Sequence, residues 1–294
     1  MMNLASRLKA LRNLKNRIVL ITGASSGIGQ ATAFEVARRG AIVVLVARNA
    51  KKLNQMAQQC MLYSGRPAFA MPVDIGDVDA VDEMLTTVSH KIGSVDVVIN
   101  AAGFGDMESA LTTSTATTEQ LFRVNVLGLI YITRRLASEM LDKRYGAIIN
   151  VASVAALVPT PKSAVYTATK AAVVGYSNVL RQELRPFGVQ VTTVNPGPVA
   201  TNFFNVADQN GTYLSRVARF TVTPQLVASR LVETIGYHVR EVTVPRYFTA
   251  AAMAYRVWPD AGDFVINQLF KERHHWPRRH QLSATDSTTT PEAD

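Results

Sequence analysis

Six short apolar runs recur along the chain, and they constrain its fold more than any other feature of the sequence. The runs are RIVLIT (17–22), AIVVLVA (41–47), PAFAMPV (67–73), VDVVIN (95–100), GAIINVAS (146–153) and VQVTTVNP (189–196). Nearly continuous runs of this kind are typical of parallel strands that are buried on both faces. Because the intervals between them are long enough for crossover helices, we expect a single α/β domain, a doubly wound parallel sheet of about seven strands in three layers, which is the Rossmann fold.

The first run leads directly into the loop TGASSGIG, which contains Gly23, Gly27 and Gly29. A glycine-rich turn from a strand into a helix lets backbone N–H groups approach the pyrophosphate of a dinucleotide at the helix N-terminus, where the helix dipole favours anions. Glycines also end strands for structural reasons alone. Directly after the first strand of a βαβ unit, however, the loop favours a dinucleotide-binding site.

The second run ends in VARNAKK, where an NAD site normally offers an acidic residue to the ribose 2′-hydroxyl. No acidic residue occurs between Glu35 and Asp74. The planar guanidinium of Arg48 can instead bind a 2′-phosphate with two hydrogen bonds. The alternative is a solvated basic helix start, but this leaves the missing acid unexplained, so we predict NADP(H) rather than NAD as the cofactor.

Seven motifs follow one another in a distinctive order. They are TGASSGIG (22–29), VDI (73–75), NAAG (100–103), Asn125 in VNVLG, Ser153 in INVASVA, Tyr166 and Lys170 in YTATK, and NPGPVAT (195–201). Their order and spacing over about residues 17–245 resemble the short-chain dehydrogenase/reductase family, in its NADP-preferring branch. One departure is Ala101, where that family more often has a second asparagine; we expect little loss, because the turn depends mainly on backbone contacts.

The resemblance implies a role for each motif. Asn125, Ser153, Tyr166 and Lys170 would be the catalytic residues. Asp74 would contact the adenine, and Thr201 would lie near the nicotinamide carboxamide. With the two residues that follow the second run, the expected cofactor contacts are Gly23, Ser25, Ser26, Gly27, Ile28, Gly29, Arg48, Asn49, Asp74, Ile75, Asn100, Ala101, Ala102, Gly103, Tyr166, Lys170, Pro196, Gly197, Val199 and Thr201.

Tyr166 and Lys170 stand four positions apart in SAVYTATKAA (163–172). Positions i and i+4 share one helix face, so the ammonium of Lys170 can lie below the Tyr166 ring and lower the pKa of the phenol. In isolation, a buried tyrosine and a solvated lysine would explain the same spacing. The resemblance adds that Ser153 holds the substrate oxygen toward Tyr166 and that Asn125 holds a water that links Lys170 to solvent.

These residues point to a carbonyl reductase, which transfers hydride between the nicotinamide and the carbonyl or alcohol carbon of a substrate. An apolar, on one interpretation lipid-like, pocket is expected from Phe104, Ser153, Leu157, Phe203 and Phe204. The competing class is a non-catalytic NADP(H)-binding scaffold or regulatory protein, which need not keep all four catalytic residues. The five histidines lie outside the motifs and Cys60 is the single cysteine, so we expect neither a catalytic triad nor a metal site.

The net charge of +9 is concentrated at the two ends of the chain. Residues 1–17 carry five basic residues and no acid, and residues 271–280 carry four basic residues against Glu272. A dedicated nucleic-acid groove is therefore not expected. No apolar stretch reaches the roughly 18 residues of a spanning helix, and charge comes too early for a secretory signal, so we expect a cytoplasmic protein.

We divide the chain into four parts: a basic amphipathic extension (1–16), the catalytic domain (17–245) with a mobile substrate loop (198–222), an apolar and aromatic, then basic, extension (246–280), and a disordered tail (281–294). The two extensions could rest as an interfacial pair on an anionic membrane, or pack on the domain or on a partner subunit. We favour packing. As in the family that the chain resembles, a homodimer or homotetramer is expected through the helices near 117–143 and 164–187.

Overall fold

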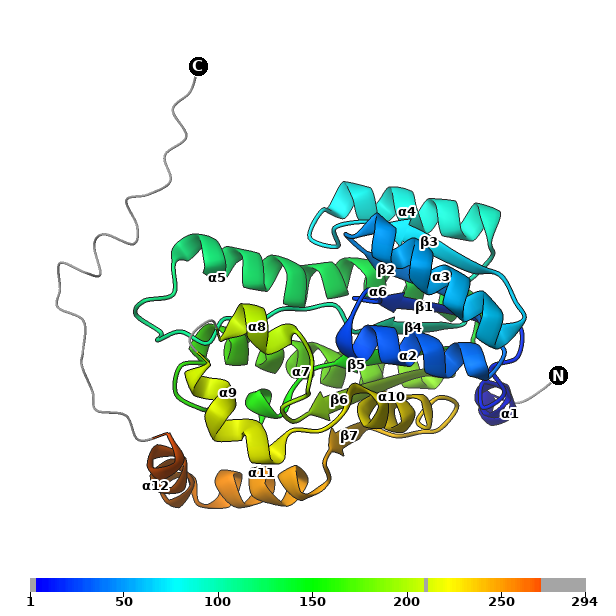
Figure 1. Cartoon of the computed structure of the whole chain (residues 1–294). Coiled ribbons are helices and arrows are strands. Elements are labelled where there is room, and N and C mark those ends of the chain that lie inside the picture. Colours follow the sequence, from blue (N-terminus) through cyan, green and yellow to red (C-terminus); the bar gives the residue numbers. More distant parts are fainter. Residues whose placement is uncertain (1–3, 209–210, 271–294) are drawn as a thin grey trace.

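The computed structural model describes residues 4–208 and 211–270. Within these residues the strands form one sheet in the order β3-β2-β1-β4-β5-β6-β7, in which every neighbouring pair is parallel (Figure 1). The strands are β1 (Ile18–Thr22), β2 (Ile42–Ala47), β3 (Ala68–Pro72), β4 (Val97–Asn100), β5 (Gly146–Val151), β6 (Val189–Pro196) and β7 (Glu241–Val244). This confirms the predicted doubly wound fold, and each of the six apolar runs contains one of the strands β1 to β6.

The seventh strand has no counterpart among those runs. β7 has the sequence EVTV, and only its last two residues are buried, because it is the edge strand beside β6. A strand this short and half exposed lacks a continuous apolar run, so its place in the sheet depends on pairing with β6 rather than on its own sequence.

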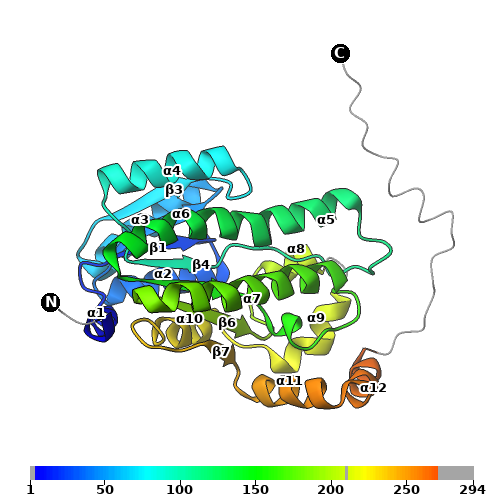
Figure 2. The same ribbon diagram turned by 180° about the vertical axis from the view of Figure 1, so that it is seen from behind.

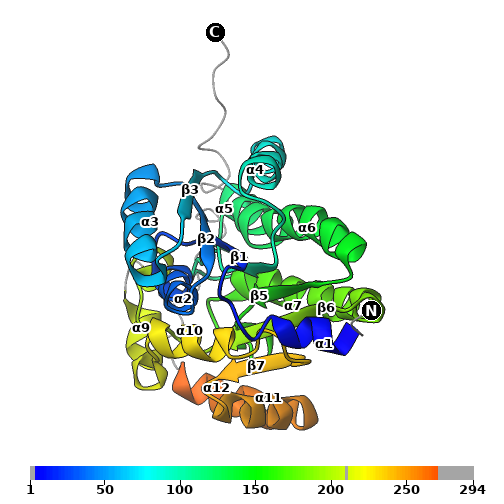
Figure 3. The same cartoon turned by 90° about the vertical axis from the view of Figure 1, so that its right-hand side faces the viewer.

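Helices cover both faces of the sheet. They are α1 (Leu4–Ala10), α2 (Gly27–Arg38), α3 (Ala50–Ser64), α4 (Val78–Lys91), α5 (Thr115–Phe122), the π-helix η1 (Arg123–Gly128), α6 (Leu129–Lys143), η2 (Val154–Ala156), α7 (Ala164–Leu184), η3 (Arg185–Phe187), α8 (Phe203–Ala207), α9 (Thr212–Val217), η4 (Ala218–Phe220), α10 (Pro224–Val232), α11 (Tyr247–Val257) and α12 (Pro259–Leu269). Figures 2 and 3 show α4, α6 and α7 on one face, and α2, α3 and α10 on the other.

The core is divided by the sheet into two apolar layers. Successive residues of β1 alternate between them: Val19 and Ile21 pack with α2, α3 and α10, whereas Leu20 packs with α4, α6 and α7. The strand order reverses at β1, which has β2 on one side and β4 on the other. In sheets of this type, ligands bind at such a reversal, beyond the carboxyl ends of the strands.

The N-terminal extension packs on the domain. Leu8, Leu11 and Leu14 are buried in the same apolar layer as Val19 and Ile21 of β1. The Arg12 side chain donates a hydrogen bond of 3.1 Å to the carbonyl of Gly236, and its guanidinium carbon lies 3.7 Å from the centroid of the Tyr237 ring. The apolar side of this extension therefore faces the protein core, so the packing interpretation holds for it.

The region expected as a mobile loop, 198–222, contains the helices α8, α9 and η4. Asn202 precedes α8, and Gly211, with φ of +65°, precedes α9. These two turn-forming residues thus stand at helix ends, where such residues are common. Residues 209–210 lie outside the described part of the chain.

The C-terminal extension begins with two helices, α11 and α12, at the edge of the molecule beyond β7 (Figure 1). The basic stretch 271–280 and the predicted disordered tail 281–294 lie outside the described residues. Among residues 4–208 and 211–270, no helix combines the length and the apolar character needed to cross a bilayer.

Candidate active site

Tyr166 and Lys170 lie on one face of α7, near its N-terminal end, and both are buried: Tyr166 is 8% exposed and Lys170 is 5% exposed. The Lys170 ammonium lies 5.8 Å from the centroid of the Tyr166 ring and donates a hydrogen bond of 3.1 Å to the carbonyl of Val151 in β5. Ser153, just beyond the end of β5, forms a side-chain hydrogen bond with Tyr166. Three of the four expected catalytic residues are thus brought together.

Burial shifts the two titratable groups of this site in opposite directions. It raises the pKa of Tyr166 well above the ordinary value, although the hydrogen bond from Ser153 opposes that shift. It lowers the pKa of Lys170 to about 8. We expected the lysine to lower the pKa of the tyrosine. The structure shows the opposite shift, because desolvation of the buried phenolate is the largest contribution to the pKa of Tyr166.

Asn125 lies in the π-helix η1 between α5 and α6, a kind of irregularity that often occurs at functional sites. Its amide oxygen accepts a hydrogen bond of 3.0 Å from the backbone N–H of Phe104, and its amide nitrogen donates to the Phe104 carbonyl (2.9 Å) and to the Thr169 hydroxyl (3.1 Å). The Thr169 hydroxyl in turn donates a bond of 2.7 Å to the carbonyl of Tyr166. Asn125 thus ties the loop after β4 to α7.

The position of Gly103 shows how close Asn125 is to Lys170. A Cβ atom at Gly103 would lie 2.9 Å from the Asn125 amide oxygen and 3.3 Å from the Lys170 ammonium. The fourth catalytic candidate therefore borders the same small volume as Lys170. Thr169 was not predicted, although its place between Tyr166 and Lys170 in YTATK, three residues after Tyr166, would have put it on the same side of α7.

The glycine loop between β1 and α2 is packed too closely for side chains. A Cβ atom at Gly23 would lie 2.7 Å from the Cα of Ala102, and one at Gly29 would overlap the carbonyl of Gly23. Gly23 and Gly27 also have positive φ, of +67° and +56°. Ser26, the N-cap of α2, makes no side-chain capping bond. The first backbone N–H groups of α2 therefore have no side-chain partner at the N-cap, and the glycines beside them carry no side chains. A pyrophosphate site requires both features.

Two other expected cofactor motifs meet this loop. A Cβ atom at Gly27 would touch Thr201, 3.2 Å away, so NPGPVAT lies beside the loop. In NAAG, the backbone N–H groups of Ala101 and Ala102 donate to the Thr22 hydroxyl at 3.1 and 3.0 Å. The turn at Ala101 is thus held through its backbone. Asn100 is turned into the core, where its amide donates to side chains of Thr133 and Asn150.

The residues after β2 differ in their availability. Arg48 is exposed and, among the described residues, forms no ion pair. The Asn49 side chain instead accepts a bond of 2.9 Å from the backbone N–H of Lys52, as the N-cap of α3. Of the two, Arg48 has its side chain free to bind a ligand, whereas the Asn49 oxygen is already used in capping.

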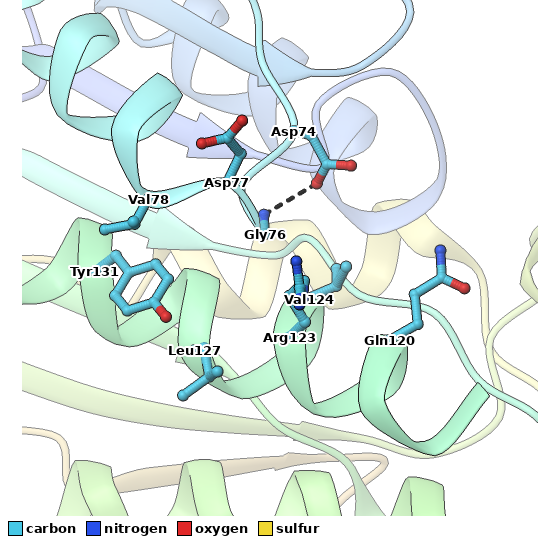
Figure 4. A pocket seen from close by; sticks show the side chains of 9 residues that line it. All are labelled: Asp74, Gly76, Asp77, Val78, Gln120, Arg123, Val124, Leu127 and Tyr131. Carbon is cyan, nitrogen blue, oxygen red and sulfur yellow. Dashed lines mark hydrogen bonds between the residues drawn. The ribbon is translucent and has the colours of Figure 1, made fainter. Parts of the chain in front are cut away.

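Asp74 lies in the loop after β3 and accepts a hydrogen bond of 2.9 Å from the backbone N–H of Gly76 (Figure 4). It also borders a surface pocket of about 480 Å³ between this loop and the consecutive helices α5, η1 and α6. The pocket is lined by Asp74, Gly76, Asp77, Val78, Gln120, Arg123, Val124, Leu127 and Tyr131. None of the four catalytic candidates lines it, so this pocket is separate from Tyr166 and its neighbours.

The region over Tyr166 is aromatic. The Phe203 ring lies 5.6 Å from the Tyr166 ring and 5.2 Å from that of Phe204, which lies 6.1 Å from Tyr213. Phe203 also occupies the space that a Cβ atom at Gly105 would need. Met107 completes the buried part of the cluster beside these rings, with its N–H bonded to the carbonyl of Ala207 at 2.7 Å.

This cluster differs in membership from the expected substrate pocket. It includes Phe203 and Phe204, as expected, but not Phe104 or Leu157. Met107 and Tyr213 were not predicted. The sequences around both residues show no clear strand or helix pattern. Only the folding of α8 and α9 over α7 brings the two side chains to Tyr166.

Comparison with known proteins gives a consistent family assignment for these residues. The family model of the short chain dehydrogenases matches residues 17–211. The chain is 36% identical over 191 residues to an uncharacterized oxidoreductase of Staphylococcus epidermidis, which covers 65% of this chain and 81% of that protein. It is 37% identical over 190 residues to another from Staphylococcus aureus, covering 64% of this chain and 80% of that protein.

Two solved structures resemble the whole domain. L-sorbose reductase from Gluconobacter frateurii, complexed with NADPH and L-sorbose, superposes with a TM-score of 0.72 at 28% identity, over 79% of this chain and 96% of that one. A short-chain dehydrogenase from Sphingobium yanoikuyae in complex with NADPH has the same TM-score of 0.72 at 25% identity, over 90% of this chain and 99% of that one.

Proposed function

The chain belongs to the short-chain dehydrogenase family, and on that premise we propose that it is an NADP(H)-dependent oxidoreductase that interconverts an apolar ketone or aldehyde and its alcohol. The observation that carries the proposal is the meeting of Ser153, Tyr166 and Lys170 at the end of β5, where Tyr166 and Lys170 are buried. A scaffold that used the cofactor only as a ligand would not need a hydroxyl, a phenol and an ammonium this close together.

The proposed cofactor site fits the residues present. The uncapped N-terminus of α2 and the loop at Gly23 and Gly29 leave room for a pyrophosphate and supply N–H donors to it. Arg48 is exposed beyond β2, where it would bind a 2′-phosphate. That two structural neighbours are complexed with NADPH supports this choice over NAD(H). When bound, the nicotinamide coenzyme would supply or accept the hydride.

In this proposal Tyr166 is the acid and base. Because burial raises its pKa, the phenol is protonated at neutral pH and can deliver its proton to the oxygen of a carbonyl substrate. Ser153 would hold that oxygen within reach of the phenol, since its hydroxyl already contacts Tyr166. The Lys170 ammonium below the ring would stabilise the phenolate that remains.

We propose that Asn125 is a positioning residue. Its amide forms hydrogen bonds with Phe104 and Thr169, so the residue would hold the loop after β4 against α7. Because Thr169 bonds to the carbonyl of Tyr166, this would also set the position of Tyr166 relative to the substrate. The substrate is proposed to be apolar because aromatic rings cover Tyr166, and a strongly polar molecule would lose hydration there without gaining partners.

The test is NADPH consumption, followed by its absorbance, over a panel of apolar ketones and aldehydes. The Tyr166→Phe variant should bind NADPH as the wild type does, but its kcat should fall at least about a thousandfold, in the range that loss of acid and base catalysis costs. Tyr145→Phe is the matched control, because Tyr145 is a partly buried tyrosine whose hydroxyl has no described partner. Undiminished turnover in Tyr166→Phe would show that the proposed mechanism is wrong.

A further inference from the structure

Helices α11 and α12 are attached to the domain along one side only. Phe248 lies against Gly197, where an added Cβ atom would be 2.7 Å from the phenylalanine ring. Ala252 and Ile266 are the buried residues of the two helices. Figures 1 and 3 show both helices at the outer edge of the molecule, beyond β7, so the rest of their surface faces away from the sheet.

That outward surface is apolar. We call it the α11–α12 face; it consists of Met253 (64% exposed), Val257 (63%), Trp258 (65%), Phe264 (65%) and Val265 (56%). Trp258 is the residue between the two helices, so large exposed apolar residues occur on α11, at the turn and on α12. Exposed apolar residues are ordinary when scattered singly, but several large ones on two adjoining helices indicate an interaction surface.

The sequence of α11 adds an amphipathic pattern to this face. Five of its exposed apolar residues follow helical spacing along one side, Tyr247, Ala250, Ala251, Ala254 and Val257, and the exposed Met253 stands beside them. The exposed cations Arg246 and Arg256 stand beside that stripe. An apolar face with aromatic residues and flanking arginines is the pattern of a helix that lies in the interface of a bilayer.

Charge favours an anionic partner over a second copy of this chain. On α12 the acidic residues are Asp260 and Asp263, and Asp263 accepts a hydrogen bond of 3.0 Å from the Tyr255 hydroxyl. The next ten residues of the sequence, 271–280, have four basic residues against one acidic residue, and the chain as a whole carries +9. Beside the face, Arg246 and Arg256 are balanced by Asp260 and Asp263, so the choice of partner depends on the net charge: two chains that each carry +9 repel each other, whereas an anionic surface attracts such a chain.

The same helices contact the segment that covers Tyr166. The Phe270 ring, after α12, lies 5.4 Å from the Tyr213 ring of α9, and its carbonyl accepts a hydrogen bond of 2.8 Å from Arg216. At the other end, Phe248 lies 6.0 Å from Phe220 of η4. Figures 1 and 2 agree that α12 lies beside α9. A bilayer that docked on α11 and α12 would thus lie next to α9 and η4, the segment that covers Tyr166.

We propose that the α11–α12 face is a docking surface for an anionic lipid bilayer, on which the protein rests without crossing it. The proposal does not depend on the proposed function, because docking can be measured without any turnover. It differs from the preference for packing in one respect: the N-terminal extension buries its large apolar residues in the core, whereas these helices, which pack on the domain through Phe248, also expose large apolar residues.

The first test is co-sedimentation of the full-length protein with vesicles of phosphatidylcholine alone and of phosphatidylcholine with one part in three of phosphatidylglycerol. We expect binding to the anionic vesicles that weakens with salt, and little binding to the neutral ones. The variant Val257→Gln/Trp258→Gln/Phe264→Gln should lower the partition coefficient about a hundredfold or more, because three large apolar side chains no longer enter the interface. Leu62→Gln/Leu226→Gln is the matched control, because it removes exposed leucines on α3 and α10.

The second test follows Trp258 itself. The chain has two tryptophans, so Trp276→Phe leaves Trp258 as the single fluorophore. Docking through the face should shift its emission to shorter wavelength and make it sensitive to quenching by brominated lipid. Unchanged Trp258 emission on vesicles, or retained binding by the triple variant, would overturn the proposal. So would a wild-type dimer that the triple variant converts to monomers, because the face would then be an interface between two copies.

Discussion

The ammonium of Lys170 lies 5.8 Å from the centroid of the Tyr166 ring, in a site where burial acts on both groups. Burial keeps the phenol protonated and makes the lysine a weaker base, with a pKa of about 8. A buried ammonium that is held by the Val151 carbonyl is costly for the fold. Burying Lys170 therefore lowers the free energy of unfolding, but it places a cation beside the proposed acid and base.

Replacing the lysine should recover that stability in a pH-dependent way. The native state lowers the pKa of Lys170 from the ordinary 10.5 to about 8, so between these values the unfolded chain binds the additional proton. The wild type should therefore become more stable as pH rises through this window. Lys170→Met should raise the free energy of unfolding by up to about 3 kcal/mol near neutral pH, an advantage that shrinks toward zero near pH 10.5.

Urea unfolding of both proteins at several values between about pH 7 and pH 10 measures this difference. A gain that stayed constant over the range would contradict the assignment to the lysine charge. The same variant should lose turnover, which would separate the role of Lys170 in the reaction from its effect on stability.

Arg48 should decide the choice between NADPH and NADH. In Arg48→Glu the new carboxylate would repel a 2′-phosphate and could accept a bond from a ribose 2′-hydroxyl. We expect the Kd for NADPH to rise by about tenfold to a hundredfold, with NADH binding unchanged or tighter, since a charge-assisted hydrogen bond contributes about 1.5–3 kcal/mol. Titration by cofactor fluorescence measures both constants. Lys91→Glu, the same charge reversal at the end of α4, should leave the ratio unchanged.

Two glycine substitutions should have opposite effects. At Gly29 an alanine Cβ would overlap the carbonyl of Gly23, so Gly29→Ala should abolish measurable NADPH binding and lower the melting temperature. Gly175 lies on the exposed side of α7, and an added Cβ meets nothing there. Gly175→Ala should therefore stabilise the protein by about 0.5–1 kcal/mol, as in other helix interiors, without changing cofactor binding. Equal effects of the two changes would argue against a steric requirement at the loop.

The N-terminal extension should behave as part of the core. Leu11 is fully buried, so Leu11→Ala should lower the free energy of unfolding by about 2–5 kcal/mol. Leu62, at 76% exposure on α3, is the control, and its replacement by alanine should change stability by less than about 0.5 kcal/mol. Chemical denaturation of the two variants gives the comparison. A Leu11→Ala protein as stable as the control would mean that residues 1–16 add nothing to the domain.

Much of the fold could be read from local patterns. The runs that became β1 to β6 are apolar without alternation, and that is a property of buried parallel strands wherever they pair. The glycine loop could also be predicted from the sequence, because its conformation requires glycine. Gly23 and Gly27 adopt positive φ, and Gly29 packs against the carbonyl of Gly23. The four-residue spacing of Tyr166 and Lys170 placed both on one side of a helix, as it does in α7.

Only the tertiary structure decided what surrounds those residues. The rise in the pKa of Tyr166, the Phe203 ring over it, and the pairing of β7 with β6 all arise from segments far apart in the sequence. The same holds for the two apolar ends, since Leu11 is buried and Trp258 is exposed, although both lie in apolar, basic-flanked segments. Periodicity fixes which side of a helix is apolar, whereas desolvation depends on what packs against that side, and that is a property of the whole chain.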